Sequence, residues 1–93
     1  MTSDKLTAGL RALGEPKRLE ILRKLIELEK NGEVTCSCLL NEIEVGQSTL
    51  SHHLSALATA GLLRTENKGK YVLLSVEHDA LKELAGLLGS LGD

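Results

Sequence analysis

The sequence predicts a mainly α-helical domain that carries one small β-hairpin. Three observations support this fold class. Leucine and isoleucine recur at helical spacing over most of the 93 residues. Two short helical segments meet at a tight turn that contains Gly46, and two β-compatible runs flank a short loop that contains Gly69. Because Tyr71 is the only aromatic residue, the core must be built from Leu, Ile, Val and Ala.

The first two helices are expected over residues 4–13 and from Pro16 to about residue 30. Leucines at positions 6, 10 and 13 give the first segment one apolar face. Pro16 suits the first turn of a helix, where its missing N–H costs nothing. The second segment ends at Asn31-Gly32, since glycine is the usual residue just beyond a helix C-terminus.

The central pair of helices predicts a helix-turn-helix unit. After a brief extended piece at residues 33–34, Thr35 is a plausible N-cap for a short helix. The turn at Val45-Gly46 leads into a second helix over about residues 47–60, which Gly61 ends. In the short helix, three apolar side chains are expected to face inward: Leu39, Leu40 and Ile43.

The hairpin follows the second of these helices directly, where the wing of a winged helix-turn-helix belongs. Its strands are expected over residues 62–66 and 70–75. A final helix is expected over residues 77–91, with leucines at helical spacing and two weakening glycines, Gly86 and Gly89. The whole chain, residues 1–93, is therefore expected to form a single winged helix-turn-helix domain.

The two terminal helices predict a homodimer. A short chain with a thin aliphatic core often gains its missing burial from a partner subunit. The first and last helices carry leucines that a lone monomer would struggle to bury. They are Leu6, Leu10, Leu13, Leu81, Leu84, Leu88 and Leu91.

The formal net charge of −2 first argues against nucleic acid as a partner. Phosphate binding, however, needs only a local positive surface. Between Gln47 and Val76 the single acidic residue is Glu66. The same segment holds three basic side chains, Arg64, Lys68 and Lys70, and two histidines, His52 and His53. This segment is therefore the expected DNA-facing surface.

Several other classes of protein are not expected. No apolar run approaches the length that spans a membrane, and the N-terminus has no signal-peptide core. Cys36 and Cys38 are too close together for a useful structural disulfide, which predicts a cytoplasmic protein with reduced thiols. No nucleophile–base pair, phosphate-binding loop or paired carboxylates stand out, so an enzyme is not expected.

Three segments of the chain share a further pattern. Residues 47–63 read QSTLSHHLSALATAGLL before the hairpin, residues 13–22 read LGEPKRLEIL, and residues 34–40 read VTCSCLL with a Cys-x-Cys pair. Together they resemble the ArsR/SmtB family of metal- and metalloid-responsive repressors over about residues 6–91. The resemblance implies a dimer formed by the first and last helices. It also implies binding to a palindromic operator in double-stranded DNA, and release when an ion binds.

The second helix of the unit and the wing hold the predicted DNA contacts. A recognition helix presents its N-terminal residues to phosphates and base edges in the major groove. We expect phosphate contacts from Gln47 and Ser48, base-edge contacts from Thr49, Ser51 and His52, and backbone contacts from Arg64, Lys68 and Lys70. The family often has arginine at the position of His52, so this chain departs from it there. His53 has two open interpretations, a structural histidine with a hydrogen-bond partner or a DNA contact.

The cysteine pair is the candidate effector site. Side chains two apart in a regular helix point about 200° away from each other, so Cys36 and Cys38 can share an ion only at a helix start. Thr35 as N-cap places them there, and the electropositive helix end favours the thiolate form. Thiolates suit As(III), Sb(III), Cd(II), Pb(II) and Zn(II). The alternative is that each cysteine is a small buried apolar residue.

Counting ligands favours arsenite or antimonite as the inducer. Zinc and cadmium normally need four protein ligands, or three with water, and the chain offers Cys36 and Cys38. Glu77, His78 and Asp79 begin the last helix, but residues 87–89 offer them no partner ligand. Trivalent arsenic accepts two thiolates with hydroxide or an external thiol. The alternatives are a soft divalent metal sensor, a thiol redox or persulfide sensor, and a winged helix that has lost effector binding or serves as a protein-interaction module.

Overall fold

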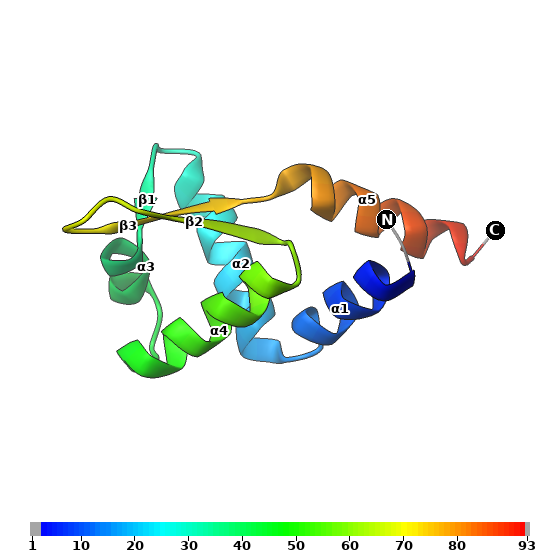
Figure 1. Ribbon diagram of the computed structural model, residues 1–93, viewed down its shortest axis with the longest axis horizontal. Helices are drawn as coiled ribbons and strands as arrows, with labels where there is room; N and C mark the ends of the chain where they lie inside the picture. Colours follow the sequence, from blue (N-terminus) through cyan, green and yellow to red (C-terminus); the bar gives the residue numbers. More distant parts are fainter. Residues whose placement is uncertain (1–2, 93) are drawn as a thin grey trace.

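The backbone forms five helices and three short strands within residues 3–92, the part of the chain that this computed structural model describes. The helices are α1 (Ser3–Leu13), α2 (Pro16–Glu29), α3 (Cys36–Glu42), α4 (Gln47–Thr59) and α5 (His78–Ser90). The strands are β1 (Val34–Thr35), β2 (Leu63–Asn67) and β3 (Val72–Val76). The predicted class, mainly α-helical with a small β element, is confirmed, and α3, α4 and the β2–β3 hairpin follow in the expected order (Figure 1).

The sheet has one more strand than the sequence predicted. β3 is the central strand, with β2 on one side and β1 on the other, and all neighbours are antiparallel. The extended piece expected at residues 33–34 lies one residue later, as the two-residue strand β1, in which Val34 lies opposite Leu74. This extra pairing joins the start of α3 to the middle of β3.

Local hydrogen bonds explain where the central helices begin and end. Thr35 is the N-cap of α3, because its Oγ1 accepts from the amide of Cys38 at 3.1 Å. Gly61 stops α4 in the left-handed region, with φ at +81°. The amides of Gly61 and Leu62 donate to the carbonyls of Ala58 and Leu57, both at 3.0 Å. The predicted cap and stop are both confirmed.

The core lies between α2, α3, α4 and the sheet. Apart from His53, the buried side chains among the described residues are alanine, isoleucine, leucine and valine. Tyr71 lies on the surface, half-exposed. The largest fully buried side chains are Ile21, Leu25, Val34, Leu39, Leu50, Leu57 and Leu62. An aliphatic core, as the composition required, is confirmed.

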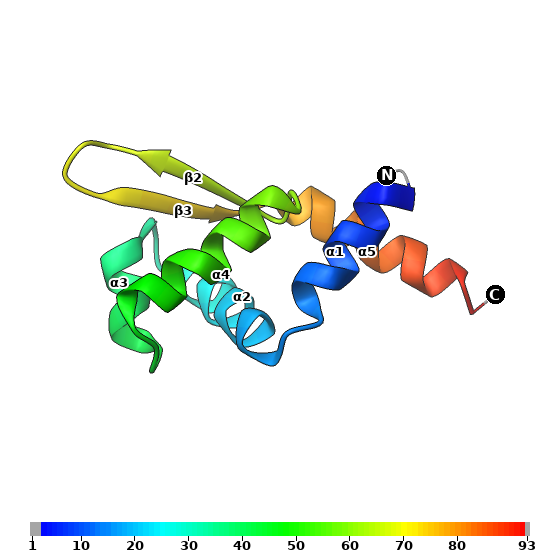
Figure 2. The same cartoon turned by 60° about the horizontal axis from the view of Figure 1, so that its bottom comes forward.

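The terminal helices lie side by side at the opposite end from the wing, along an overall length of 45 Å (Figures 1 and 2). Gly9 lets them approach closely, since a Cβ at that position would lie 3.2 Å from Cδ2 of Leu84. Leu84 is thereby buried within the same chain. Three leucines of these helices remain exposed: Leu10, Leu88 and Leu91. Within the described residues, no helix has both the length and the apolar character that crossing a membrane requires.

Candidate nucleic-acid interface and thiol site

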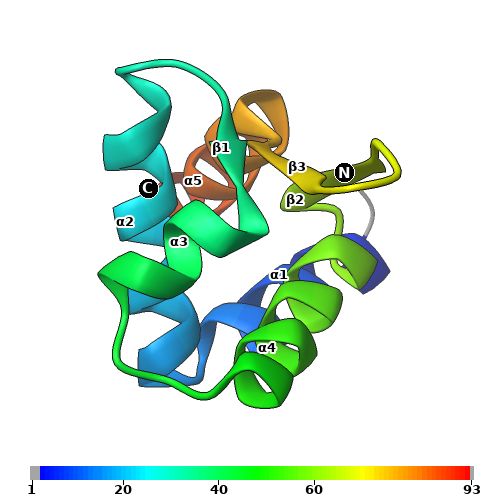
Figure 3. The same cartoon turned by 90° about the vertical axis from the view of Figure 1, so that its left-hand side faces the viewer.

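Helix α4 presents a polar face beside the wing. Its buried face consists of Leu50, His53, Leu54 and Leu57. Viewed from the wing end, α4 and the β2–β3 hairpin lie on one side of the molecule and α2 on the other (Figure 3). All five DNA contacts that the sequence predicted on this helix are exposed: Gln47, Ser48, Thr49, Ser51 and His52.

The N-terminus of α4 is open to a bound anion. Gly46 occupies the N-cap position and supplies no side-chain hydrogen bond to the first turn. The amide of Leu50 is the first to bond back into the helix, to the Gly46 carbonyl at 2.9 Å. Because the preceding amides have no cap, they are free to donate to a phosphate, which the helix dipole also attracts.

His53 is a buried structural residue and does not belong to the exposed face of α4. It is buried, and its Nδ1 accepts a hydrogen bond from Nε of Arg18 at 3.1 Å. Its Nε2 lies 3.4 Å from Oε2 of Glu15. The ring therefore joins α4 to the beginning of α2, which fixes the orientation of α4 on the core. Of the two interpretations of His53, the structure favours the structural one.

The three cations of the wing differ in their surroundings. Lys68 Nζ lies 2.7 Å from Oε1 of Glu66, and this hydrogen bond raises the pKa of Lys68 and lowers that of Glu66. Arg64 Nε lies 3.6 Å from Oε1 of Glu77. Lys70 is exposed and has no ion pair among residues 3–92. The sequence predicted all three as contacts to the DNA backbone, and within the described residues the structure leaves Lys70 without an ion pair.

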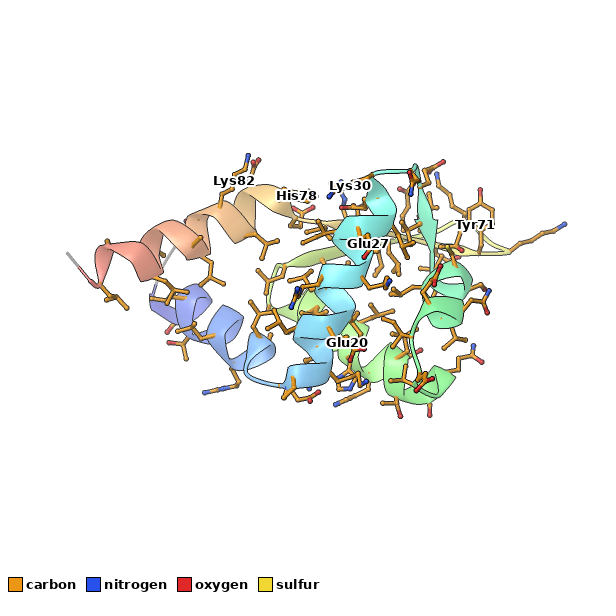
Figure 4. The ribbon with its side chains drawn as sticks, turned by 180° about the vertical axis from the view of Figure 1, so that it is seen from behind. Glu20, Glu27, Lys30, Tyr71, His78 and Lys82 are labelled. Carbon is orange, nitrogen blue, oxygen red and sulfur yellow. The ribbon has the colours of Figure 1, made fainter. Side chains whose placement is uncertain are left out.

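Two acidic residues of α2, Glu20 and Glu27, lie away from α4. Figure 4 shows the molecule from behind, with Glu20 and Glu27 on α2 nearest the viewer. Both carboxylates are paired on that face, Glu20 with Lys17 at 2.8 Å and Glu27 with Lys24 at 3.6 Å. Helix α4 itself contains no acidic residue. These two carboxylates therefore do not face a phosphate at α4.

The two cysteines occupy the first turn of α3 in different environments. Cys36 is the first residue of the helix and packs half-buried against the core, whereas Cys38 is exposed. Burial raises the pKa of the Cys36 thiol. Burial of Cys36 therefore opposes the stabilisation of the thiolate that the sequence predicted from the electropositive helix start. Within residues 3–92 no group of three or more His, Cys, Asp or Glu side chains is arranged to hold a metal ion.

The chain matches a known family and several of its members. Residues 15–65 match the family described as "Bacterial regulatory protein, arsR family". The arsenical resistance operon repressor of Bacillus subtilis is 42% identical over 85 residues, which cover 90% of this chain and 74% of the repressor. The transcriptional activator HlyU of Vibrio cholerae is 30% identical over 89 residues, which cover 96% of this chain and 79% of HlyU.

Solved structures show the same fold. An ArsR-like transcriptional regulator from Rhodococcus sp. RHA1 superposes with a TM-score of 0.79 at 25% identity, covering 96% of this chain and 80% of that one. HlyU from Vibrio cholerae superposes with a TM-score of 0.73, covering 96% and 92%. A homodimeric winged helix-turn-helix DNA-binding domain from Mycobacterium bovis gives 0.71 at 22% identity, covering 96% and 80%.

Proposed function

Because the chain belongs to the arsR family of bacterial regulatory proteins, which are DNA-binding transcriptional regulators and not enzymes, we propose that it is an ion-responsive repressor. Residues 1–93 act as one DNA-binding domain that binds a palindromic operator as a homodimer. Arsenite or antimonite releases it through Cys36 and Cys38. The observation that carries the proposal is the exposed, acid-free face of α4 beside the wing, with the cysteine pair in the helix that supports it.

The geometry of α4 and the wing supports the proposed DNA contacts. Gln47 and Ser48 contact phosphate at the uncapped helix start, while Thr49, Ser51 and His52 contact base edges. In the wing, Arg64, Lys68 and Lys70 contact the DNA backbone. The position of His53 in the core supports this assignment, because it limits the histidine contact to His52.

Base discrimination by His52 tests this interface. In His52→Ala, discrimination at one base pair should fall by about 1–3 kcal/mol, while binding to unrelated DNA stays unchanged. Fluorescence anisotropy with operator duplexes that differ at single positions measures both quantities. Lys30→Ala, on the surface beyond α2, is the control. Equal discrimination by the wild-type chain and His52→Ala would remove His52 from the interface.

The dimer is formed by the exposed leucines of the terminal helices. Leu10, Leu88 and Leu91 leave apolar surface in water at the end of the molecule remote from the wing. The sequence also assigned Leu84 to this dimer surface. That prediction is wrong, because Leu84 is buried against Gly9 inside its own chain. The homodimeric state of the Mycobacterium bovis relative supports the assembly.

The inducer site is supported by the relatives and by the position of the cysteines. Arsenical resistance operon repressors of two Staphylococcus species, 35% and 33% identical, match this chain alongside that of Bacillus subtilis. Cys36 is half-buried and Cys38 exposed, so bringing both sulfurs to one ion requires the first turn of α3 to change shape. A ligand shifts a conformational equilibrium only by its differential affinity for the two states. Since α3 precedes α4 by one short turn, its rearrangement disturbs the recognition helix.

Ion-induced release from DNA tests the inducer. The Cys36→Ser, Cys38→Ser double variant should bind the operator normally and ignore arsenite, antimonite and soft divalent ions. Anisotropy with and without each ion, under reducing conditions, measures this, and Ser37→Ala between the cysteines is the matched control. Undiminished release of the double variant would place the sensor elsewhere.

A thiol redox sensor on the same scaffold is the second candidate. Cys38 is exposed to oxidants, and one solved relative, 29% identical, is described as reduced HlyU from Vibrio cholerae. A disulfide between residues two apart is strained, which counts against an intramolecular bond. Release of the wild-type chain by peroxide or persulfide, together with no release by any ion, would favour this candidate.

A further inference from the structure

A groove of ≈ 430 Å³ runs between α1, α2 and α4. It exists because the facing positions carry methyl side chains, which leave space between the three helices. The alanines that line it are Ala8 and Ala12 of α1 and Ala56 and Ala60 at the α4 end. No acidic side chain of the described residues lines the groove.

The rim of the groove is basic. Arg11 is exposed and makes no ion pair among residues 3–92. Arg18 donates its Nε to His53, which holds the guanidinium in place while its terminal nitrogens have no partner in the described part of the chain. His52 lies on the same rim. Two guanidinium groups and an imidazole thus border an apolar floor.

We propose that this groove binds an organic anion, a carboxylate on an apolar body of medium length. The volume is in the range of small-molecule sites, and arginine is suited to carboxylates through paired N–H donors. A DNA phosphate would use Arg11 and Arg18 but leave the alanine floor without a contact. The apolar floor therefore favours a small amphipathic acid over the DNA backbone.

The groove stays accessible in the proposed dimer and adjoins the DNA-binding surface. In a regular helix, Leu10 projects about 160° away from both Ala8 and Ala12, so a dimer through Leu10 leaves the groove open. Its other wall is α4, where His52 belongs to both the rim and the exposed polar face. A bound acid therefore lies against the proposed recognition helix, and none of the residues that line the groove belongs to α3, which holds the cysteine pair.

Binding of decanoate tests the site without DNA or metal. Titration into the isotopically labelled chain should give saturable shifts of the Ala8, Ala56 and Ala60 amide signals, with the affinity measured by calorimetry. Butyrate has the same charge with a short chain and decylamine the same chain with a positive charge, and both should bind at least about tenfold more weakly, as the loss of one anchoring interaction implies. Equal binding of decylamine, or no saturable shift with decanoate, would overturn the proposal.

Two variants locate the ligand. Arg11→Gln should weaken decanoate binding about tenfold, as expected for one charge-assisted hydrogen bond, and Ala56→Leu should abolish it by filling the groove. Arg23→Gln, an exposed arginine on the far side of α2, is the matched control and should bind decanoate normally. Circular dichroism checks that each variant is folded. Wild-type affinity in Ala56→Leu would exclude the groove, and an Arg11→Gln variant that binds decanoate normally but the operator weakly would assign the rim to DNA phosphates.

Discussion

The two ends of this molecule bury their apolar side chains to very different extents. All of the largest fully buried side chains lie in residues 21–62, in the helix-turn-helix end, and none lies in α1 or α5. Helix α5 has one buried side chain, Leu84, whereas Leu88 and Leu91 are exposed at 40% and 74%. The helix-turn-helix end therefore completes its own core, while the terminal helices leave apolar surface for a partner.

The largest effect is expected from the core of the helix-turn-helix end. Leu57 is fully buried in α4, and Leu57→Ala should lower the free energy of unfolding by about 2–5 kcal/mol through lost transfer energy and a cavity. Urea unfolding followed by circular dichroism measures the change. A loss below about 1 kcal/mol would mean that this end is not the main source of stability.

The next largest effect is expected on dimerisation, without loss of the folded state. Leu88→Glu should turn the dimer into a folded monomer and raise the dimer dissociation constant at least about tenfold, because it places a charge on the apolar contact surface. Leu19→Glu is the matched control, since Leu19 on α2 is 43% exposed and Leu88 40%. Sedimentation velocity at micromolar concentration measures whether each variant is a monomer or a dimer. If Leu19→Glu rather than Leu88→Glu gave the monomer, the dimer surface would lie on α2.

Replacing glycine by alanine should change the stability of the protein in opposite directions at the two ends of the molecule. Gly61 stops α4 at φ +81°, so Gly61→Ala should destabilise the protein by about 1–2 kcal/mol. Gly86 lies within α5, where an added Cβ meets nothing within 4 Å, so Gly86→Ala should stabilise by up to about 1 kcal/mol. Thermal unfolding of both variants measures the difference. Destabilisation by both would show that Gly86 has a packing role in the assembly.

The smallest effect concerns the wing. Lys70 is unpaired within residues 3–92, so Lys70→Ala should reduce the slope of operator affinity against salt by about one unit. Lys68→Ala should reduce it less, because Glu66 already neutralises that ammonium. Affinity titrations at several salt concentrations compare the two. The reverse order would mean that the Lys68–Glu66 pair opens on DNA.

The sequence predicted the features that depend on neighbouring residues and missed the contacts between residues far apart in the chain. Helical spacing, Thr35 and Gly61 placed the helix boundaries closely, because caps and stops act within a few residues. Strand β1 was not expected to pair, since two residues carry no periodicity and the partner is forty positions away. The Arg18–His53 bond joins residues 35 apart, so only the folded chain shows it. Spacing alone likewise assigned Leu84 to the dimer surface, although Gly9 gives it a place inside the chain.

Strand β3 has a mechanical consequence, because it runs into α5 with only Glu77 between them. Glu29 of α2 secures this junction, where Oε2 accepts from the Val76 amide at 3.0 Å and Oε1 lies 2.9 Å from Nε2 of His78. The hairpin and α5 are thus joined as one stiff arm, with the wing at one end and the exposed leucines at the other. In the proposed dimer, two such arms joined at α5 would hold the two wings a set distance apart, and that distance would limit which spacings of DNA half-sites the dimer can bind.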